Sequence, residues 1–149
     1  MRPSSLRPVG VVTAINGATR FQVEIEGVAG HSGTVPMHLR HDALAAAAEC
    51  VLAIETRARA EVDLVATVGK LEALPGAINV IPGKARFTLD VRAPADTQRR
   101  KAASDMTDTL RAICEKRGVK LSMTILHENT IADRKSTRLN SSHGYISYA

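Results

Sequence analysis

The chain has no tryptophan and only two phenylalanines and two tyrosines among its 149 residues. Proteins that bind single-stranded nucleic acid stack the bases on aromatic side chains. This scarcity therefore argues against a nucleic-acid partner, despite the formal net charge of +5. No apolar run approaches the roughly 20 residues of a membrane span, and residues 1–10 lack the apolar segment of a secretory signal. We expect a cytoplasmic protein without a membrane partner.

Cysteine is also scarce, and Cys50 and Cys114 lie too far apart in sequence for a zinc knuckle or a disulfide framework. Each falls on the apolar face of an expected helix, so buried thiols are predicted. His38 and His41 are spaced to chelate a metal, but no aspartate or cysteine joins them at ligand spacing. Solvated histidines at the start of a helix are the simpler interpretation, and no metal site is predicted.

The apolar content of 44% and the charged content of 23% are those of an average soluble domain. Residues 133–149 depart from this, because they show no helical or strand period and resemble a translated sequencing adapter. We interpret them as a non-native tail. The tail holds three of the 20 basic residues and one of the 15 acidic residues. Without it the charge is only +3, which is weak evidence for a polyanionic partner.

Hydrophobic periodicity predicts an α+β fold over residues 18–132. Strands are expected over residues 20–28, 61–71, 84–92 and 119–125, and helices over residues 37–60 and 96–117. A short strand over residues 10–15 precedes them. Ser32 or Thr34 could cap the first helix, and Asp96 the second. The order βαββαβ is typical of a ferredoxin-like antiparallel sheet with two helices on one face and polar side chains on the other.

Three residues stand out as candidates for binding or catalysis. His31 lies in a glycine-rich loop, where its imidazole could donate to a substrate oxygen or could be a plain surface histidine. Asn79 is a polar residue within an apolar extended run. Arg92 ends a strand and offers a planar fork for a carboxylate. An ion pair between Arg92 and Asp90 or Glu24 is equally compatible with its position.

Five segments together resemble the hydantoinase/carbamoylase branch of the M20 metal-dependent amidohydrolases. This branch includes N-carbamoyl-L-amino-acid hydrolases, allantoate amidohydrolases and β-ureidopropionases. The segments are GATR (17–20), GHSGTVPM (30–37), RHDAL (40–44), PGAINVIPG (75–83) and LDVRAP (89–94). The resemblance implies that residues 1–17 are a stub of a catalytic domain with its hinge. It also implies that residues 18–132 are a ferredoxin-like lid, or dimerisation, domain.

The resemblance also implies roles for individual residues. His31 would reach across a homodimer and polarise the scissile carbonyl of a small-molecule substrate. Asn79 and Arg92 would bind the carboxylate end of that substrate, and Arg20 would be a further substrate contact. The full-length enzyme would carry divalent metal ions, Zn or Mn/Co. The metal ligands and the general-base glutamate would lie in segments outside this chain, so we expect no metal bound by the fragment.

The expected function is therefore that of a fragment of a metal-dependent hydrolase of linear amide or ureido C–N bonds, inactive by itself. A free-standing ferredoxin-like module is the alternative, with Arg92 binding an amino-acid carboxylate. A plain dimerisation module without catalysis is a third interpretation.

Overall fold

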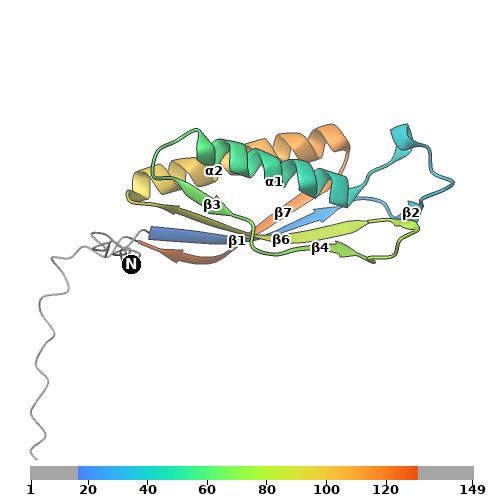
Figure 1. The fold of residues 1–149 in the computed structure, drawn as a ribbon, viewed down its shortest axis with the longest axis horizontal. Coiled ribbons are helices and arrows are strands. Elements are labelled where there is room, and N and C mark those ends of the chain that lie inside the picture. Colours follow the sequence, from blue (N-terminus) through green and yellow to red (C-terminus); the bar gives the residue numbers. More distant parts are fainter. Residues whose placement is uncertain (1–16, 131–149) are drawn as a thin grey trace, which may run out of the picture.

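Two helices cover one face of an antiparallel sheet in the computed structural model, which describes residues 17–130 (Figure 1). The sheet order is β3-β6-β1-β7, and β4 also pairs with β6. The helices are α1 (Ala43–Arg59) and α2 (Asp96–Arg117). The strands are β1 (Gly17–Glu26), β3 (Val65–Thr67), β4 (Leu71–Leu74), β6 (Lys84–Ala93) and β7 (Lys120–Asn129). The predicted ferredoxin-like α+β class is confirmed.

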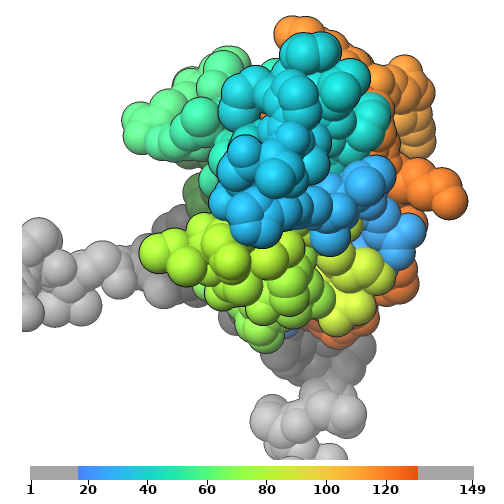
Figure 2. All heavy atoms as spheres, turned by 90° about the vertical axis from the view of Figure 1, so that its right-hand side faces the viewer, coloured from blue at the N-terminus to red at the C-terminus, as the bar shows by residue number. Residues whose placement is uncertain are grey.

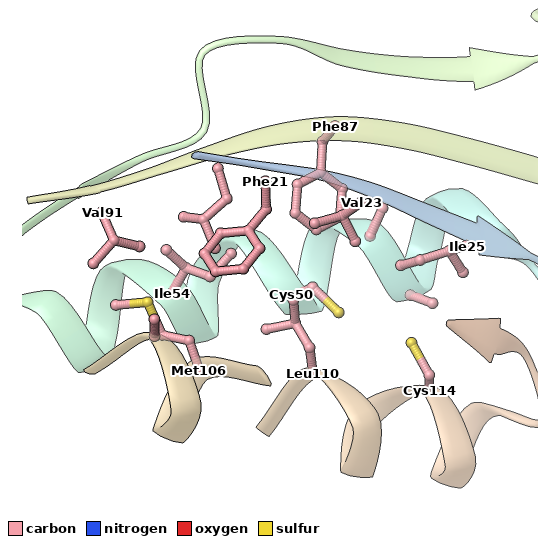
Figure 3. Close-up of a cluster of buried hydrophobic side chains, with 14 of the residues drawn as sticks. Phe21, Val23, Ile25, Cys50, Ile54, Phe87, Val91, Met106, Leu110 and Cys114 are labelled. Atoms are coloured by element: carbon pink, nitrogen blue, oxygen red, sulfur yellow. The ribbon is translucent and has the colours of Figure 1, made fainter. Parts of the chain in front are cut away.

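The two central strands explain why one face is covered and the other open. β1 and β6 pair from Gly17 opposite Ala93 to Glu26 opposite Lys84. Alternate side chains of each strand point to opposite faces of a sheet. Those facing the helices form the core drawn in Figure 3. They are Phe21, Val23, Ile25, Ala85, Phe87, Leu89 and Val91. The opposite face, here called the open face, carries polar and charged residues.

The first helix begins later than the sequence predicts. It starts at Ala43, while Met37–Leu39 forms a separate turn of 3-10 helix. The side chain of Asp42 accepts hydrogen bonds from the backbone N–H groups of Leu44 and Ala45, at 2.9 and 3.1 Å. Asp42 is therefore the N-cap, and the predicted caps Ser32 and Thr34 are wrong.

The second helix has the predicted bounds, but the predicted cap Asp96 is wrong. Asp96 lies inside α2, and Ala95 occupies the cap position without a side-chain hydrogen bond. The carboxylate of Asp96 binds Arg99 instead of capping the helix. The predicted stop at Gly118 is confirmed, because this residue takes a left-handed φ of 64° that glycine adopts at low cost.

The strand predicted over residues 61–71 is divided into β3 and β4, which pair with opposite ends of β6. Leu64 is buried as predicted, whereas Val62 is 82% exposed, contrary to its predicted inward position. The backbone turns at Asp63, which has a φ of 63°. Val62 therefore precedes the turn and lies outside the strand, which begins only at Val65.

Chain entry and exit lie at the same end of the sheet. Ala18, near the start of β1, pairs with Asn129 at the end of β7. β7 runs beyond its predicted end at residue 125, and its register with β1 shifts between Arg20 and Phe21. The predicted strand over residues 10–15 and the tail over residues 133–149 lie outside the described residues. Neither α1 nor α2 is long and apolar enough to cross a membrane.

Candidate functional site

A two-stranded clip brings His31 and Asn79 together from distant parts of the sequence. The clip consists of β2 (Gly30–His31) and β5 (Val80–Ile81), with His31 opposite Val80. The backbone N–H of Ser32 donates to the carbonyl oxygen of Asn79 at 3.0 Å. Figure 2 looks onto this end of the molecule, where the segment around residues 30–40 lies against the segment around residues 75–80.

The ring of His31 is held in a defined orientation within its loop. Its Nδ1 accepts a hydrogen bond from the backbone N–H of Gly33 at 3.1 Å. A neutral imidazole that accepts at Nδ1 carries its proton on Nε2. The residue is exposed, so this Nε2–H is available to donate to an oxygen atom of a bound molecule. The arrangement suits polarisation of a carbonyl group.

A second group of candidate residues lies on the open face. Arg20 donates from Nε to Asp90 at 3.1 Å. Arg92 donates to both carboxylate oxygens of Asp90, from Nε at 3.1 Å and from Nη2 at 2.9 Å. Hydrogen bonds from Arg92, and then from Arg20, hold the pKa of Asp90 below its usual range. The group therefore carries two positive charges and one negative charge.

This observation identifies which ion pair Arg92 makes. Of the two partners considered from the sequence, Asp90 binds Arg92, whereas Glu24 binds Lys84 and Arg86. Arg92 is exposed, and its fork is pre-oriented by Asp90.

A hollow of about 580 Å³ opens beside these arginines. Its volume falls within the roughly 300–1,000 Å³ of small-molecule sites. Gly69, in the break between β3 and β4, forms part of its wall. The residues that line it include Arg20, Thr67, Thr88, Asp90, Arg92 and Leu126.

The four predicted site residues thus form two pairs, not one cluster. The clip adjoins the Lys84 end of β6, whereas Arg92 lies near the other end. Eight residue steps at about 3.3 Å each separate the two ends by about 26 Å. Within one copy of the chain, Asn79 therefore lies beside His31 and not beside Arg92.

The described residues do not form a metal centre. Within residues 17–130, no group of three or more histidine, cysteine, aspartate or glutamate side chains could hold a metal ion. His38 is exposed in the 3-10 turn. His41 points to the end of α2, where its Nδ1 lies 3.3 Å from the carbonyl oxygen of Arg117. These side chains do not fit the metal ions that the family resemblance implies.

Arg40 is a contact residue that the sequence did not reveal. Its guanidinium donates to the carbonyl oxygens of Ser32 and Val35, in the loop that carries His31. Backbone acceptors leave no pattern in a sequence. The only available signal was the presence of Arg40 in the RHDAL segment.

The fold and its two polar groups define a ferredoxin-like α+β domain with exposed candidate binding residues at both ends of its sheet. Residues 13–118 match the peptidase dimerisation domain of the M20 family. The chain belongs to this family.

Named relatives extend this assignment. Allantoate deiminase 2 of Glycine max is 37% identical over 131 residues, covering 75% of this chain and 27% of that protein. The N-carbamoyl-L-amino acid amidohydrolase of Geobacillus stearothermophilus is 42% identical over 124 residues, covering 81% and 30%. A crystal structure of a hydantoinase/carbamoylase family amidase from Burkholderia ambifaria superposes with a TM-score of 0.80 at 29% identity, covering 85% and 32%. The chain thus spans less than a third of the length of these relatives.

Proposed function

We propose that this chain is the lid and dimerisation domain of a metal-dependent hydrolase that cleaves amide or ureido C–N bonds in a small molecule. The names of the relatives, allantoate deiminase and N-carbamoyl-L-amino acid amidohydrolase, support this reaction class. The pairing of Ala18 with Asn129 also supports it, because a domain whose two ends are adjacent can be inserted into another domain. The metal ions would be bound outside residues 17–130.

The separation of the two residue pairs is the observation that carries the proposal. One small substrate cannot contact His31 and Arg92 of the same copy when about 26 Å of strand lies between them. Two copies resolve this, because His31 and Asn79 of one copy can meet Arg20 and Arg92 of the other. A dimerisation domain supplies the means of bringing them together.

In such a composite site the residues would have distinct tasks. The Nε2–H of His31 donates to the oxygen of the scissile carbonyl and stabilises the negative charge that develops there. The side chain of Asn79 adds a neutral polar contact beside it. The Nη1–Nη2 edge of Arg92, which Asp90 leaves free, would bind a carboxylate of the substrate, and the two hydrogen bonds to Asp90 would hold the guanidinium in place.

We propose that the second copy contacts the surface formed by the outer flank of α1 and the edge strand β3. In the described residues, β3 pairs only with β6, which leaves its other edge open to a further strand. Leu52 on α1 is 63% exposed, and Val62 and Val65 are 82% and 52% exposed. Exposed apolar side chains beside an open strand edge favour association with another chain.

A chimera tests the proposed function. Residues 17–130 replace the corresponding segment of the Geobacillus amidohydrolase, and turnover of an N-carbamoyl-L-amino acid is measured. We expect the chimera to be active and His31→Ala to lower kcat by about 10²–10³, as for the loss of one oxyanion donor. Arg92→Ala should mainly raise KM. An active chimera in which His31→Ala has no effect would refute the proposal.

Hybrid dimers test the composite site directly. If each site takes His31 from one copy and Arg92 from the other, a dimer of His31→Ala with Arg92→Ala has one fully intact site. Mixing the two weakened variants should then restore activity. If each site instead uses both residues of the same copy, every site in the hybrid carries one alanine substitution. Activity would then stay at the level of the separate variants although hybrid dimers form.

The hollow beside Arg92 gives specific support to the second candidate, a ligand-binding module. In that case the 149-residue chain itself should bind an N-carbamoyl-L-amino acid in calorimetry, and Arg92→Ala should abolish the binding. Under the lid-domain proposal the isolated chain should bind such a compound weakly, because the metal-binding part of the site lies outside residues 17–130.

A further inference from the structure

We propose that Arg40 is the positioning residue of His31, setting which ring nitrogen carries the proton. The inference rests on the proposed function in one respect, which is that His31 is the residue that would contact the substrate. The structural link between the two residues stands on the contacts within this chain.

Arg40 binds the His31 loop at two points. Its Nη2 donates to the carbonyl oxygen of Ser32 at 2.6 Å, and its Nε donates to the carbonyl oxygen of Val35 at 3.0 Å. The guanidinium is rigid and planar, so two such bonds fix both acceptors relative to one side chain. Arg40 itself is half-buried and extended, between the 3-10 turn and α1.

The Ser32–Gly33 peptide group connects Arg40 to the imidazole. The carbonyl oxygen of this peptide accepts from Arg40, and its N–H, which belongs to Gly33, donates to Nδ1 of His31. The C=O and N–H of a trans peptide point in opposite directions from one rigid plane. By fixing the oxygen, Arg40 aims the N–H at Nδ1 and keeps the proton of the neutral ring on Nε2.

The preceding peptide is held by a separate hydrogen bond. The N–H of Ser32 donates to the carbonyl oxygen of Asn79. Both backbone polar groups of Ser32 are thus bound. Its N–H binds the carbonyl oxygen of Asn79, which precedes β5, and its carbonyl oxygen binds Arg40. The loop that carries His31 is therefore held between the clip and the guanidinium, in an otherwise glycine-rich segment.

Ion pairing does not account for this use of Arg40. The nearest acidic residue in sequence, Asp42, uses its Oδ1 to accept the N–H groups of Leu44 and Ala45 at the start of α1. The guanidinium of Arg40 instead binds two neutral carbonyl oxygens of a single loop. A role confined to capping or to helix stability would not direct it there.

Nitrogen-15 NMR of the 149-residue chain tests the link. In the parent chain, His31 should be mainly in the Nε2–H form, and the Gly33 amide should be protected from exchange. Arg40→Ala should shift the ring toward a mixture of tautomers and speed exchange of the Gly33 amide about five- to tenfold, as for the loss of one hydrogen bond. Arg40→Lys should be intermediate, because a lysine lacks the fork that binds two acceptors.

Two controls separate positioning from general destabilisation. Arg59→Ala removes an exposed arginine of α1 that pairs with Glu55 along its own helix, and should leave His31 unchanged. Amides of the central strands β1 and β6 report whether the fold is intact. If Arg40→Ala leaves both the tautomer and the Gly33 exchange rate unchanged while the fold is intact, the inference is wrong.

The chimera distinguishes this failure from failure of the proposed function. Arg40→Ala should lower kcat when His31 is present and have no further effect when His31 is already alanine. An equal loss in both backgrounds would contradict positioning through His31. If the tautomer shifts in NMR while His31→Ala leaves turnover intact, Arg40 positions His31 but the proposed catalytic role is refuted.

Discussion

Arg92 donates two hydrogen bonds to the carboxylate of Asp90, and both residues lie on the open face of β6. The side chain of Asp90 is three-quarters buried, with a relative exposure of 25%. Arg20 binds the same carboxylate from the neighbouring strand. Asp90 therefore fixes two guanidinium groups beside the hollow. One positive charge remains uncompensated, as recognition of a carboxylate requires.

The first prediction concerns the pKa of Asp90. Hydrogen bonds from Arg92 and Arg20 lower its pKa, so its carbon-13 titration should lie below the ordinary aspartate value of about 3.9. Because the folded pKa is lowered, the contribution of Asp90 to stability is complete above the unfolded value. It is lost as the pH falls through the lowered folded value. Arg92→Ala should raise the pKa of Asp90.

Arg86→Ala is the matched control, because Arg86 lies on the same face of β6 but binds Glu24. It should leave the titration of Asp90 unchanged. A parent Asp90 that titrates at or above the ordinary value would show that the arginines do not stabilise its charged form.

The sequence predicted the order of the main elements because each has a clear periodicity. Alternation marks the central strands, and buried positions three and four residues apart mark both helices. The start of α1 was missed because residues 37–39 are helical in character but are separated from α1 by the extended Arg40. The pairing of β2 with β5 was missed, although the extended run that contains β5 was expected. Each strand has only two residues, and its partner lies far along the chain.

The candidate residues could be recognised because each is unusual in its local sequence. Which of them lie together in space could not be predicted. A histidine between glycines and an asparagine within an apolar run stand out in sequence. Which of them meet depends on long-range pairing, and only the structure places Asn79 with His31. The pairing of Arg92 with Asp90 was predictable, because residues two apart on a strand share one face.

The second prediction concerns Arg99, whose side chain is fully buried. It donates to the hydroxyl of Thr19 at 2.9 Å and to Glu128 at 3.2 Å, and it also binds Asp96. These contacts join the starts of β1 and α2 to the end of β7. Arg99→Ala should destabilise the chain by about 3 kcal/mol, at the lower end for breaking a buried ion pair, because its acidic partners keep contact with water. Urea unfolding measures this.

Arg111→Ala is the control for Arg99, since Arg111 lies on the same helix in an exposed pair with Asp108. Its effect should stay within about 0.5 kcal/mol. Equal effects of the two substitutions would mean that the buried contacts of Arg99 add nothing to stability.

The third prediction concerns the proposed interface with a second copy, on the outer flank of α1. Leu52→Glu places a charge on the proposed interface and should shift the chain from dimer to monomer in sedimentation velocity. Ile125→Glu is the matched control, because Ile125 is similarly exposed, at 58%, on the opposite edge strand. This variant should remain dimeric. Dimers of Leu52→Glu as stable as those of the parent would exclude the outer flank of α1 as the interface.

The last prediction concerns the two buried thiols, whose predicted burial is confirmed at 0% and 1% exposure for Cys50 and Cys114. Their sulfur atoms point toward one another between α1 and α2 (Figure 3). The hydrogen bond between the two thiols raises the pKa of Cys50, and burial raises it further. The same hydrogen bond lowers the pKa of Cys114, against an opposing effect of burial.

Cys114 should therefore react with iodoacetamide before Cys50, because the thiolate is the reactive form. Access favours the same order, since Cys114 also lines a hollow of about 520 Å³ that Leu121, Met123 and Ile125 border. Peptide mass spectrometry after brief labelling of the folded chain measures both rates. In concentrated urea the two rates should become equal, because hydrogen bond and burial are both lost. Faster labelling of Cys50 in the folded chain would contradict the lowered pKa of Cys114 and its greater access.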